Sequence, residues 1–432
     1  MNKKKWLFII LVLITLILVL SRTKNENIDN AGELAYFDLQ EKYAEIAIKE
    51  EEDYKKFMNE EDKYISDRPS AAKSSELIED TVIAPVLETK INMKKNYIYC
   101  ATAQFAWNSL CNDVFKGTVE IENAPYYVEH LNNHITDFSF LSTSECMALA
   151  DFIKNKIYER IDKELAEKFN ESLKKLGITK LGINPEDIFA FSYLAKSITF
   201  KEKFNKIRKA LAFKFGDKKV DVKAFGIDNN HTNEQMCEQA VIRYHNTYRP
   251  EIPIGLILEL KSQKSDEEII ISTCTVENTL LASFVMLDDL INCRGEKYIK
   301  MDDKEAKRSM TEYISSIAPT NIDKYENLHI PVINFNVIHK YKDILGKRIK
   351  NQNLDKNYII ADAVQWIYFL LNESGAELKS FAAFHILIGP NNPYVIDRPF
   401  IIYLKEKKSK YPYFMAYIAN DELLVKFEEK NK

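Results

Sequence analysis

Helical patterns and strand-like runs occupy different parts of this chain, and this separation limits the folds that it can adopt. Apolar residues recur at helical spacing over 100–115 and 145–169, and further helices are expected at 279–291 and 302–316. From residue 188 onwards, short β-branched and aromatic runs dominate, as is typical of strands. Helices that precede the strands favour an α+β fold, because a doubly wound parallel sheet needs the two to alternate. The expected strands are 188–200, 210–215, 220–227, 239–244, 254–260, 269–274, 332–338, 359–371, 400–404 and 413–418.

Glycine is scarce in this chain, with 11 glycines among 432 residues, about 2.5% against a usual share of about 7%. The sequence holds neither a GxGxxG motif nor a Walker loop, so a glycine-rich nucleotide cradle is not expected. The 60 basic and 64 acidic residues leave a formal net charge of −4. This balance offers no excess of positive charge for DNA or RNA, and no nucleic-acid partner is expected.

The first residues predict a membrane anchor. Three lysines at 3–5 precede an apolar run from Trp6 to Leu20, which only Thr15 interrupts. A helix over residues 6–21 would be about 24 Å long, short for a bilayer core of about 30 Å. Snorkelling of Lys5 and Arg22 can extend its reach. Because the lysines should stay in the cytoplasm, residues 1–24 are interpreted as a signal anchor that places the remainder outside it.

A cleaved signal peptide is the alternative interpretation. The apolar run ends in Ser21-Arg22-Thr23-Lys24, which offers no small-x-small cleavage site. It also holds no cysteine for lipoprotein processing. The sequence therefore favours a single-pass anchor with a cytoplasmic N-terminus and an exported body, which would be secreted if the signal were cleaved.

A charged segment separates the apolar run from the body. Residues 33–65 hold neither glycine nor proline, and they predict a polar helix that is either a solvated spacer or a partner-binding helix. A linker is expected at 66–80. We interpret 25–90 as a stalk and linker and 91–432 as one folded domain. The residues expected on one face of the polar helix are Leu39, Tyr43, Ile46 and Tyr54.

The six cysteines are widely spaced, and no two form a CxxC pair, so a zinc ribbon is not expected. Their neighbours are apolar, which suits buried free thiols. An exported compartment would also permit disulfides, and the sequence leaves the pairing undetermined. These residues are Cys100, Cys111, Cys146, Cys237, Cys274 and Cys293.

No pattern in the sequence indicates an enzyme. His130 and His134 are four residues apart and could share a helix face, but zinc ligation needs a third ligand and the catalytic glutamate of HExxH is missing. The pair is therefore interpreted as structural. The sequence has no Gly-x-Ser-x-Gly elbow, and the basic run 405–410 is too short for a nucleic-acid footprint. Neither a cofactor nor a metal is expected.

Three segments carry a resemblance to a known family. Residues 397–404, a charged turn and residues 413–420 resemble the closing hairpin of serpins. Residues 363–371 followed by 372–377 are similar to the serpin strand that runs into the reactive-centre hinge. Residues 190–204 are similar to the serpin segment in which a strand reaches a phenylalanine-lysine pair and an aromatic turn. The three segments keep serpin order and spacing.

The resemblance implies a serpin-like α+β fold, with N-terminal helices on a large mixed sheet, smaller sheets and an exposed reactive-centre-type loop. It implies that this sheet can accept the cleaved loop as an extra strand and so trap a protease as an acyl-enzyme. It places the hinge at Glu373, Gly375, Ala376 and Leu378. The implied partner is an extracytoplasmic protease or another protein.

The loop after the hinge has the alternation that strand insertion requires, with one face apolar. The inward set would be Ala376, Leu378, Ser380, Ala382, Phe384, Ile386 and Ile388, and the outward set Glu377, Lys379, Phe381, Ala383, His385 and Leu387.

Some residues depart from the pattern of inhibitory serpins. Leu378, Lys379 and Phe381 interrupt the run of small residues expected after the hinge, and bulk there slows insertion. Gln365 stands where the resemblance leads us to expect a histidine that helps to lock the sheet.

The expected cleavage position also departs from the family. Counting through the loop from Glu373 reaches Gly389, which precedes Pro390. Proline lacks an N–H and has a fixed φ, so most serine proteases handle such a bond poorly. A shift of one or two residues gives Ile388-Gly389 or Leu387-Ile388. The favoured interpretation is a non-inhibitory or weakly inhibitory protein that acts by protein–protein interaction, and a functional inhibitor is the alternative.

Overall fold

Two strands near the C-terminus form the hairpin at the centre of the largest sheet. β18 (Phe400–Glu406) and β19 (Phe414–Ile418) are antiparallel, with Phe400 opposite Ile418 and Leu404 opposite Phe414. Every residue of β19 is buried, which fits its apolar sequence, since a strand that is covered on both faces has no polar side. The sheet has eight strands, in the order β12 (Thr320–Asn321), β9 (Ala240–His245), β10 (Ile254–Leu260), β11 (Glu267–Cys274), β18, β19, β3 (Asn96–Cys100) and β2 (Thr81–Ala84).

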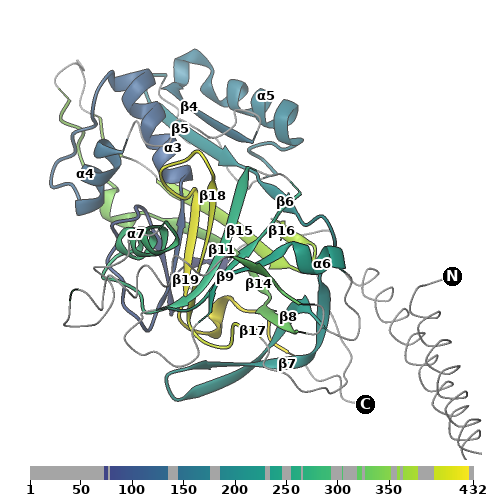
Figure 1. Ribbon diagram of the computed structural model, residues 1–432. Coiled ribbons are helices and arrows are strands. Elements are labelled where there is room, and N and C mark those ends of the chain that lie inside the picture. The colour runs from purple at the N-terminus through teal and green to yellow at the C-terminus, as the bar shows by residue number, and fades with distance from the viewer. Residues whose placement is uncertain are drawn as a thin grey trace, which may run out of the picture. The chain divides into compact units, whose positions relative to one another are not determined.

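The computed structural model describes most of the chain from residue 73 onwards (Figure 1), and these residues belong to one unit, 63–432. The expected anchor at 1–24 and the polar helix at 33–65 lie outside the described residues. None of the helices within the described ranges has both the length and the apolar character that crossing a membrane requires. The described ranges are 73–75, 78–134, 145–175, 185–228, 234–245, 254–263, 266–292, 304, 319–323, 326–351, 358–360, 363–377 and 394–427.

A five-stranded sheet contains the strands that the resemblance assigned to the hinge region. β14 (Ile333–Lys340) and β15 (Val364–Asn372) pair antiparallel over eight residue pairs, from Ile333 opposite Leu371 to Lys340 opposite Val364. The order of this sheet is β1 (Lys73–Ser74), β14, β15, β16 (Gly375–Glu377) and β6 (Ser197–Thr199).

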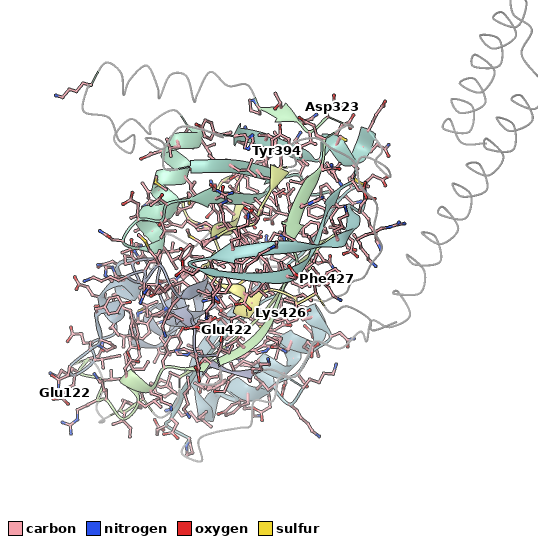
Figure 2. All side chains as sticks on the ribbon, turned by 90° about the horizontal axis from the view of Figure 1, so that it is seen from below. Glu122, Asp323, Tyr394, Glu422, Lys426 and Phe427 are labelled. Atoms are coloured by element: carbon pink, nitrogen blue, oxygen red, sulfur yellow. The ribbon has the colours of Figure 1, made fainter. Side chains whose placement is uncertain are left out.

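The remaining described strands form two smaller sheets. One has four strands, and the other pairs two antiparallel strands. The segment 424–427 near the C-terminus runs beside β8, where the Phe427 N–H donates to the Asp221 carbonyl at 3.0 Å (Figure 2). The strands are β17 (Tyr394–Val395), β13 (Leu328–Pro331), β8 (Lys218–Ile227) and β7 (Asn205–Phe215) in the first sheet, and β4 (Cys146–Phe152) and β5 (Ile188–Leu194) in the second.

The helices are short, and α3, α4 and α5 lie at the end of the body where β4 and β5 lie (Figure 1). α7 begins as the sequence predicts, because the Thr279 hydroxyl caps it by accepting from the Ala282 N–H at 3.0 Å. The helices are α3 (Thr102–Ser109), which continues as a π-helix (Leu110–Phe115), α4 (Tyr126–Asn133), α5 (Ile157–Phe169), α6 (Glu234–Glu238) and α7 (Leu280–Ile291).

The largest apolar core joins the five-stranded and eight-stranded sheets. The Phe369 ring of β15 stacks on the Phe414 ring of β19, with the ring centroids 4.3 Å apart. Phe335 of β14 lies 5.8 Å from Phe369 in the same cluster. From α7, Phe284 packs edge-on against Tyr403 of β18 at 5.3 Å. Aromatic pairs of this geometry add to the apolar burial that fixes the sheets together.

Most of the expected strands are confirmed, and β10 coincides with the predicted range 254–260. The α+β fold class is also confirmed. The expected strand over 359–371 begins only at Val364. Of the expected helix at 302–316, only residue 304 is described.

The prediction of one helix over 145–169 is wrong in its first half. Residues 146–152 form β4, which pairs antiparallel with β5, and helix α5 begins only at Ile157. Lys156 has a φ of +56°, which separates α5 from the short 3₁₀ turn before it. A short apolar run fits either period, and here the pairing partner supplied by β5 decides for a strand.

The folded body begins earlier in the chain than the predicted boundary at Ile91. β2 pairs parallel with β3, and Ala84 and Val86 are buried. Three strands, β1, β2 and β3, therefore precede the first described helix, which corrects the expectation that helices come first. The five described cysteines are free thiols, and Cys293 lies outside the described residues.

Candidate functional site

The hinge predicted from the resemblance is a tight turn between two paired strands. Glu373 and Ser374 reverse the chain, and the Ser374 N–H donates to the Asn372 side-chain oxygen at 2.9 Å. β16 then runs back beside β15, with Gly375 opposite Asn372 and Ala376 opposite Leu371. This is an Asx turn, in which an asparagine side-chain oxygen accepts a hydrogen bond from the backbone N–H two residues further along the chain.

β16 is an interior strand of the sheet, because it pairs on both sides. Its other neighbour is β6, with Gly375 opposite Thr199 and Ala376 opposite Ile198. Both pairings are antiparallel, so β15 and β6 run parallel to each other on either side of β16 (Figure 1). The Ala376 side chain is 3% exposed and belongs to the main core. The start of the loop thus forms part of the sheet.

The glycine at 375 is required by its neighbour. Gly375 has a φ of +146°, a conformation that L side chains rarely adopt. A Cβ atom placed there would lie 2.1 Å from the carbonyl oxygen of Ile198. Only glycine lets β16 approach β6 this closely.

The segment over 190–204, which carries part of the resemblance, binds the hinge turn directly. The Phe200 N–H donates to the Ser374 carbonyl at 3.1 Å, and the Phe204 N–H donates to the Glu373 carbonyl at 2.9 Å. The Glu373 carboxylate lies 3.7 Å from the Lys206 ammonium, and both side chains are 6% exposed. The hinge turn is therefore held by two backbone hydrogen bonds and by the ion pair between Glu373 and Lys206.

A buried ion cluster lies next to β6, the strand that pairs with β16. Lys196, just before β6, is 4% exposed and contacts Glu145 and Glu406, each at 2.8 Å, as well as Glu267. The Tyr413 hydroxyl donates to Glu267 at 2.9 Å. Burial alone would lower the pKa of Lys196, but the three carboxylates raise it, so the ammonium stays charged.

Below β16, the sheet is open among the described strands. Residues 364–369 of β15 pair with β14 on one side, and no described strand pairs with them on the other. A side chain of β5 contacts β15 here. The Tyr193 ring of β5 and the Trp366 ring of β15 stack, with centroids 6.5 Å apart and an interplanar angle of 10°. The Trp366 N–H also donates to Asn336 at 2.6 Å.

The register of β16 shows which loop residues match this edge. If the β15–β16 pairing continued, residue 378 would lie opposite Phe369 and residue 383 opposite Val364. Side chains alternate along a strand, so positions 378, 380 and 382 would share the buried face of Ala376. Of the predicted inward set, Ala376 is buried, and the members from 378 onwards lie outside the described residues.

Gln365 takes the place of the expected histidine near the far end of the open edge. It is 5% exposed, and it accepts from the Tyr341 hydroxyl at 2.5 Å. Its amide donates to the Cys100 carbonyl at 3.0 Å and to the Thr102 hydroxyl at 2.8 Å. Gln365 therefore links β15 to the start of α3 with its polar atoms satisfied.

The structure brings together three of the predicted site residues, Glu373, Gly375 and Ala376. Sequence analysis missed the Lys196 cluster and the Tyr193–Trp366 stack. A lysine inside the otherwise apolar run 188–200 was the available signal for the cluster, since a buried lysine needs partners. The predicted residues outside the described ranges are Leu378, Leu387, Ile388, Gly389 and Pro390.

Known proteins were compared with this chain by sequence and by structure. No family model matches it, and no curated protein matches it by sequence. The solved structures that match include a serpin from the trematode Schistosoma haematobium, with 11% identity over 76% of this chain and 94% of that chain, and a TM-score of 0.41. They also include native protease nexin-1 with heparin, with 12% identity over 76% and 93% and a TM-score of 0.41. A thyroxine-binding globulin complex with thyroxine has 10% identity over 76% and 93%, and a TM-score of 0.41.

The closing hairpin and the strand that leads into the hinge turn are present at the residues that carried the resemblance.

Proposed function

We propose that this serpin-like protein acts on another protein through the loop 378–393, and that its five-stranded sheet takes up the start of this loop as a strand once the loop is cut. The observation that carries the proposal is the position of Gly375–Glu377 between β15 and β6, paired with both. The protein is then the ligand or substrate of its partner and not itself an enzyme.

Backbone pairing supplies the driving force for insertion. Over residues 364–369, β15 pairs with β14 on one side, and its other side continues the side on which Leu370–Asn372 pair with β16. Residues 378–383 have the matching length in the continued register and the matching alternation. Added strands gain main-chain hydrogen bonds, and side chains at alternate positions set which face is buried.

Side chains on the outward face oppose rapid insertion. In the continued register, Phe381 would lie opposite Trp366, whose ring stacks on Tyr193. The two rings must separate for the backbone of the loop to pass between β15 and β5. Trapping a protease requires insertion before the acyl-enzyme hydrolyses, so we propose a protein-recognition module with weak or no inhibition.

Protease inhibition is the second candidate, and the hinge favours it. The turn, Gly375 and Ala376 are already placed within the sheet, so insertion would start from a formed nucleus. The bond cut in either case is proposed to lie among Leu387, Ile388, Gly389 and Pro390.

A protease panel tests both candidates. The purified chain is incubated with serine and cysteine proteases, the cut is located by mass spectrometry, and the melting temperature is measured before and after nicking. A cut loop with a raised melting temperature and no SDS-stable complex supports the recognition module. An SDS-stable covalent complex supports inhibition instead. An unchanged melting temperature after the cut contradicts insertion and therefore both versions.

The location of the protein is part of the proposal. Lysines at 3–5 followed by the apolar run 6–20 support an anchored, exported body that meets an extracytoplasmic protease or another protein. Fractionation of cells with an antibody against the body, with and without added protease, tests this orientation. Recovery of the body in the cytosol would contradict it.

A further inference from the structure

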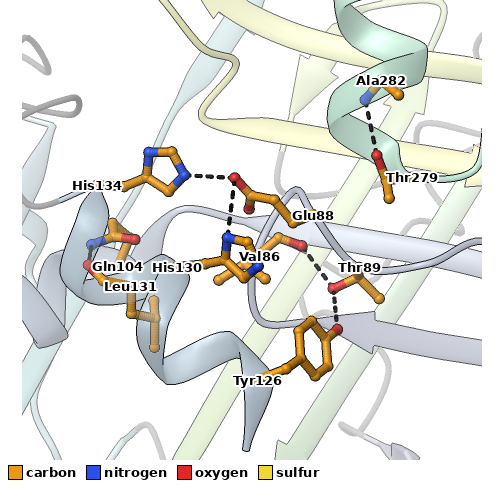
Figure 3. A network of polar contacts seen from close by, with 10 residues as sticks. All are labelled: Val86, Glu88, Thr89, Gln104, Tyr126, His130, Leu131, His134, Thr279 and Ala282. Atoms are coloured by element: carbon orange, nitrogen blue, oxygen red, sulfur yellow. Dashed lines mark hydrogen bonds and ion pairs between the residues drawn. The ribbon is translucent and has the colours of Figure 1, made fainter. Parts of the chain in front are cut away.

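Three side chains from two distant segments meet beside helix α4. The Glu88 carboxylate lies 2.6 Å from Nε2 of His134 and 3.7 Å from Nδ1 of His130, measured from the same oxygen, Oε1 (Figure 3). One potential ligand atom from each residue lies within 4.8 Å of the other two. The group combines two imidazoles and one carboxylate, which is a ligand set that zinc uses.

Helix geometry places the two histidines on one face. His130 is in the last turn of α4 and His134 is its C-cap, with the His134 N–H donating to the His130 carbonyl at 3.1 Å. Residues four apart in a helix are neighbours on its surface. The amide of Gln104 in α3 donates to the Leu131 carbonyl at 2.8 Å and fastens this end of the helix.

The loop after β2 supplies the carboxylate, and it is tied to the other end of α4. The Thr89 hydroxyl donates to the Val86 carbonyl at 2.8 Å, which closes the loop around Glu88. The Tyr126 hydroxyl, at the start of α4, donates to the Thr89 hydroxyl at 3.1 Å (Figure 3). The loop thus contacts both ends of α4, through Tyr126 at its start and through His130 and His134 at its end.

The spacing suits a small cation. Zinc bonds of 2.0–2.1 Å in a tetrahedron separate the ligand atoms by about 3.3 Å. The observed separations of 2.6 and 3.7 Å from Glu88 lie on either side of this value, and the ligand atoms of the two histidines lie within 4.8 Å of each other. The C-terminal end of α4 also carries partial negative charge, which favours a cation there.

The surroundings have room and an unused ligand atom. A cavity of about 10 Å³, the room of about one water molecule, is lined by Glu88, His134, Gln104 and Tyr411 among others. The second carboxylate oxygen of Glu88 is buried and has no hydrogen-bond partner among the described residues. The His130 side chain is 33% exposed, which leaves a path for an ion to enter.

We propose that Glu88, His130 and His134 bind a divalent transition metal of the zinc class, with water as the fourth ligand. Nitrogen ligands favour zinc over magnesium or calcium, which prefer oxygen. The metal would join the loop after β2 to α4 and stabilise this part of the fold. The chemistry proposed is structural, and it is independent of the loop 378–393.

The competing explanation is an ion pair between Glu88 and a protonated His134. The two differ in their response to metal. A metal site binds zinc in a definite ratio and depends on all three side chains, including His130. An ion pair depends on Glu88 and His134 in the absence of metal and gains nothing from zinc.

Titration of zinc into metal-stripped protein decides between them. The full-length chain is titrated in competition with a chromogenic chelator, and the visible spectrum of bound cobalt reports the ligand geometry. We expect one zinc per chain, weakened more than about 100-fold by His134→Ala or His130→Ala, since even outer-shell changes cost 10–100-fold. Glu88→Gln should also weaken binding.

His245→Gln is the matched control, because it removes an exposed histidine at the end of β9 and should bind zinc like the wild type. If His134→Ala fails to fold, His130→Ala carries the test, with its metal-free melting curve as a check. Absence of stoichiometric zinc binding by the wild type would overturn the proposal. Equal loss of affinity in His245→Gln and His130→Ala would also overturn it.

Discussion

Gly375 lies against the carbonyl of Ile198 so closely that a Cβ atom at position 375 would lie 2.1 Å from that oxygen. This contact is where the first residue of β16 meets β6, the strand that runs parallel to β15. It explains why glycine stands at the start of β16, and it makes the position a direct test of whether the pairing of β16 contributes to stability.

Gly375→Ala should destabilise the protein. The new Cβ would collide with backbone and would have to adopt a φ near +146°, which together cost on the order of 2 kcal/mol or expel β16 from the sheet. Urea unfolding measures the loss, and hydrogen exchange of β15 amides reports the expulsion. Gly117→Ala is the control, because its Cβ would meet nothing within 4 Å. Equal stability of the two variants would show that β16 is not held in this position.

A charge on the inward face of the loop should block insertion. If the β15–β16 register continued, Ser380 would lie opposite Ile367, which is buried, and Phe381 would lie opposite Trp366 on the other face. Ser380→Arg should abolish the rise in melting temperature that follows nicking, because a buried unpaired guanidinium is costly. Phe381→Arg places the same side chain on the other face and should keep the rise. If both variants behave alike, the continued register is wrong.

Lys196→Met should be strongly destabilising at neutral pH. It would leave Glu145, Glu267 and Glu406 together without a cation, and breaking a buried pair typically costs about 3–5 kcal/mol. Chemical denaturation measures the change. The surface variant Lys163→Met, whose side chain is 72% exposed, should change stability by less than about 0.5 kcal/mol.

The pH dependence of Lys196→Met gives a second readout. The folded pKa of Lys196 is raised above its usual 10.5, so the wild type keeps this stabilisation below pH 10.5 and loses it as the pH rises through the folded pKa. Burial raises the pKa of Glu267 despite the lowering by Lys196 and Tyr413. The defect of the variant should therefore shrink in acid, where the carboxylates become neutral. A defect that is the same at pH 4 and pH 7 would contradict the charge explanation.

Asp397→Asn should remove a small, pH-dependent stabilisation. Burial opposes ionisation of Asp397, but Lys214 at 2.9 Å and Arg398 at 3.0 Å bring its pKa below the usual 3.8. A lowered carboxyl pKa stabilises above the unfolded value and is lost as the pH falls through the folded value. Because both cations are exposed, we expect no more than about 1 kcal/mol at pH 7, with little left at pH 2.

Salt and a second carboxylate provide the controls for that prediction. The difference between Asp397→Asn and wild type should fall in high salt, since exposed charges are screened. Asp217→Asn, in the exposed turn between β7 and β8, removes the same charge from a carboxylate outside the Asp397 pairing. A loss in Asp217→Asn equal to that in Asp397→Asn would rule out the specific pairing.

Local patterns in the sequence predicted the elements whose stability is local. The capped helix α7 and the mostly apolar strand β10 were found at the expected residues, because a cap and a short run of apolar residues act within a few positions. β4 was missed for the opposite reason. Its residues 146–152 form a strand only because β5 lies beside them, and that pairing partner is some forty residues further along the chain.

The candidate sites divide in the same way. The hinge turn and the alternation of residues 376–388 could be read from the sequence and its resemblance. The metal-binding cluster could not, since Glu88 is more than forty residues from His130 and no short motif links them. The Lys196 cluster likewise draws its carboxylates from three separate segments.

The sequence alone therefore determined most of the strands and helices, and its resemblance gave the expected hinge and the loop residues that would share a face. Only the tertiary structure decided that β16 lies between β15 and β6 and that Gly375 lies against the Ile198 carbonyl. The reason is that strand pairing joins residues far apart in the chain, and a period-2 pattern specifies the faces of a strand without naming its neighbours.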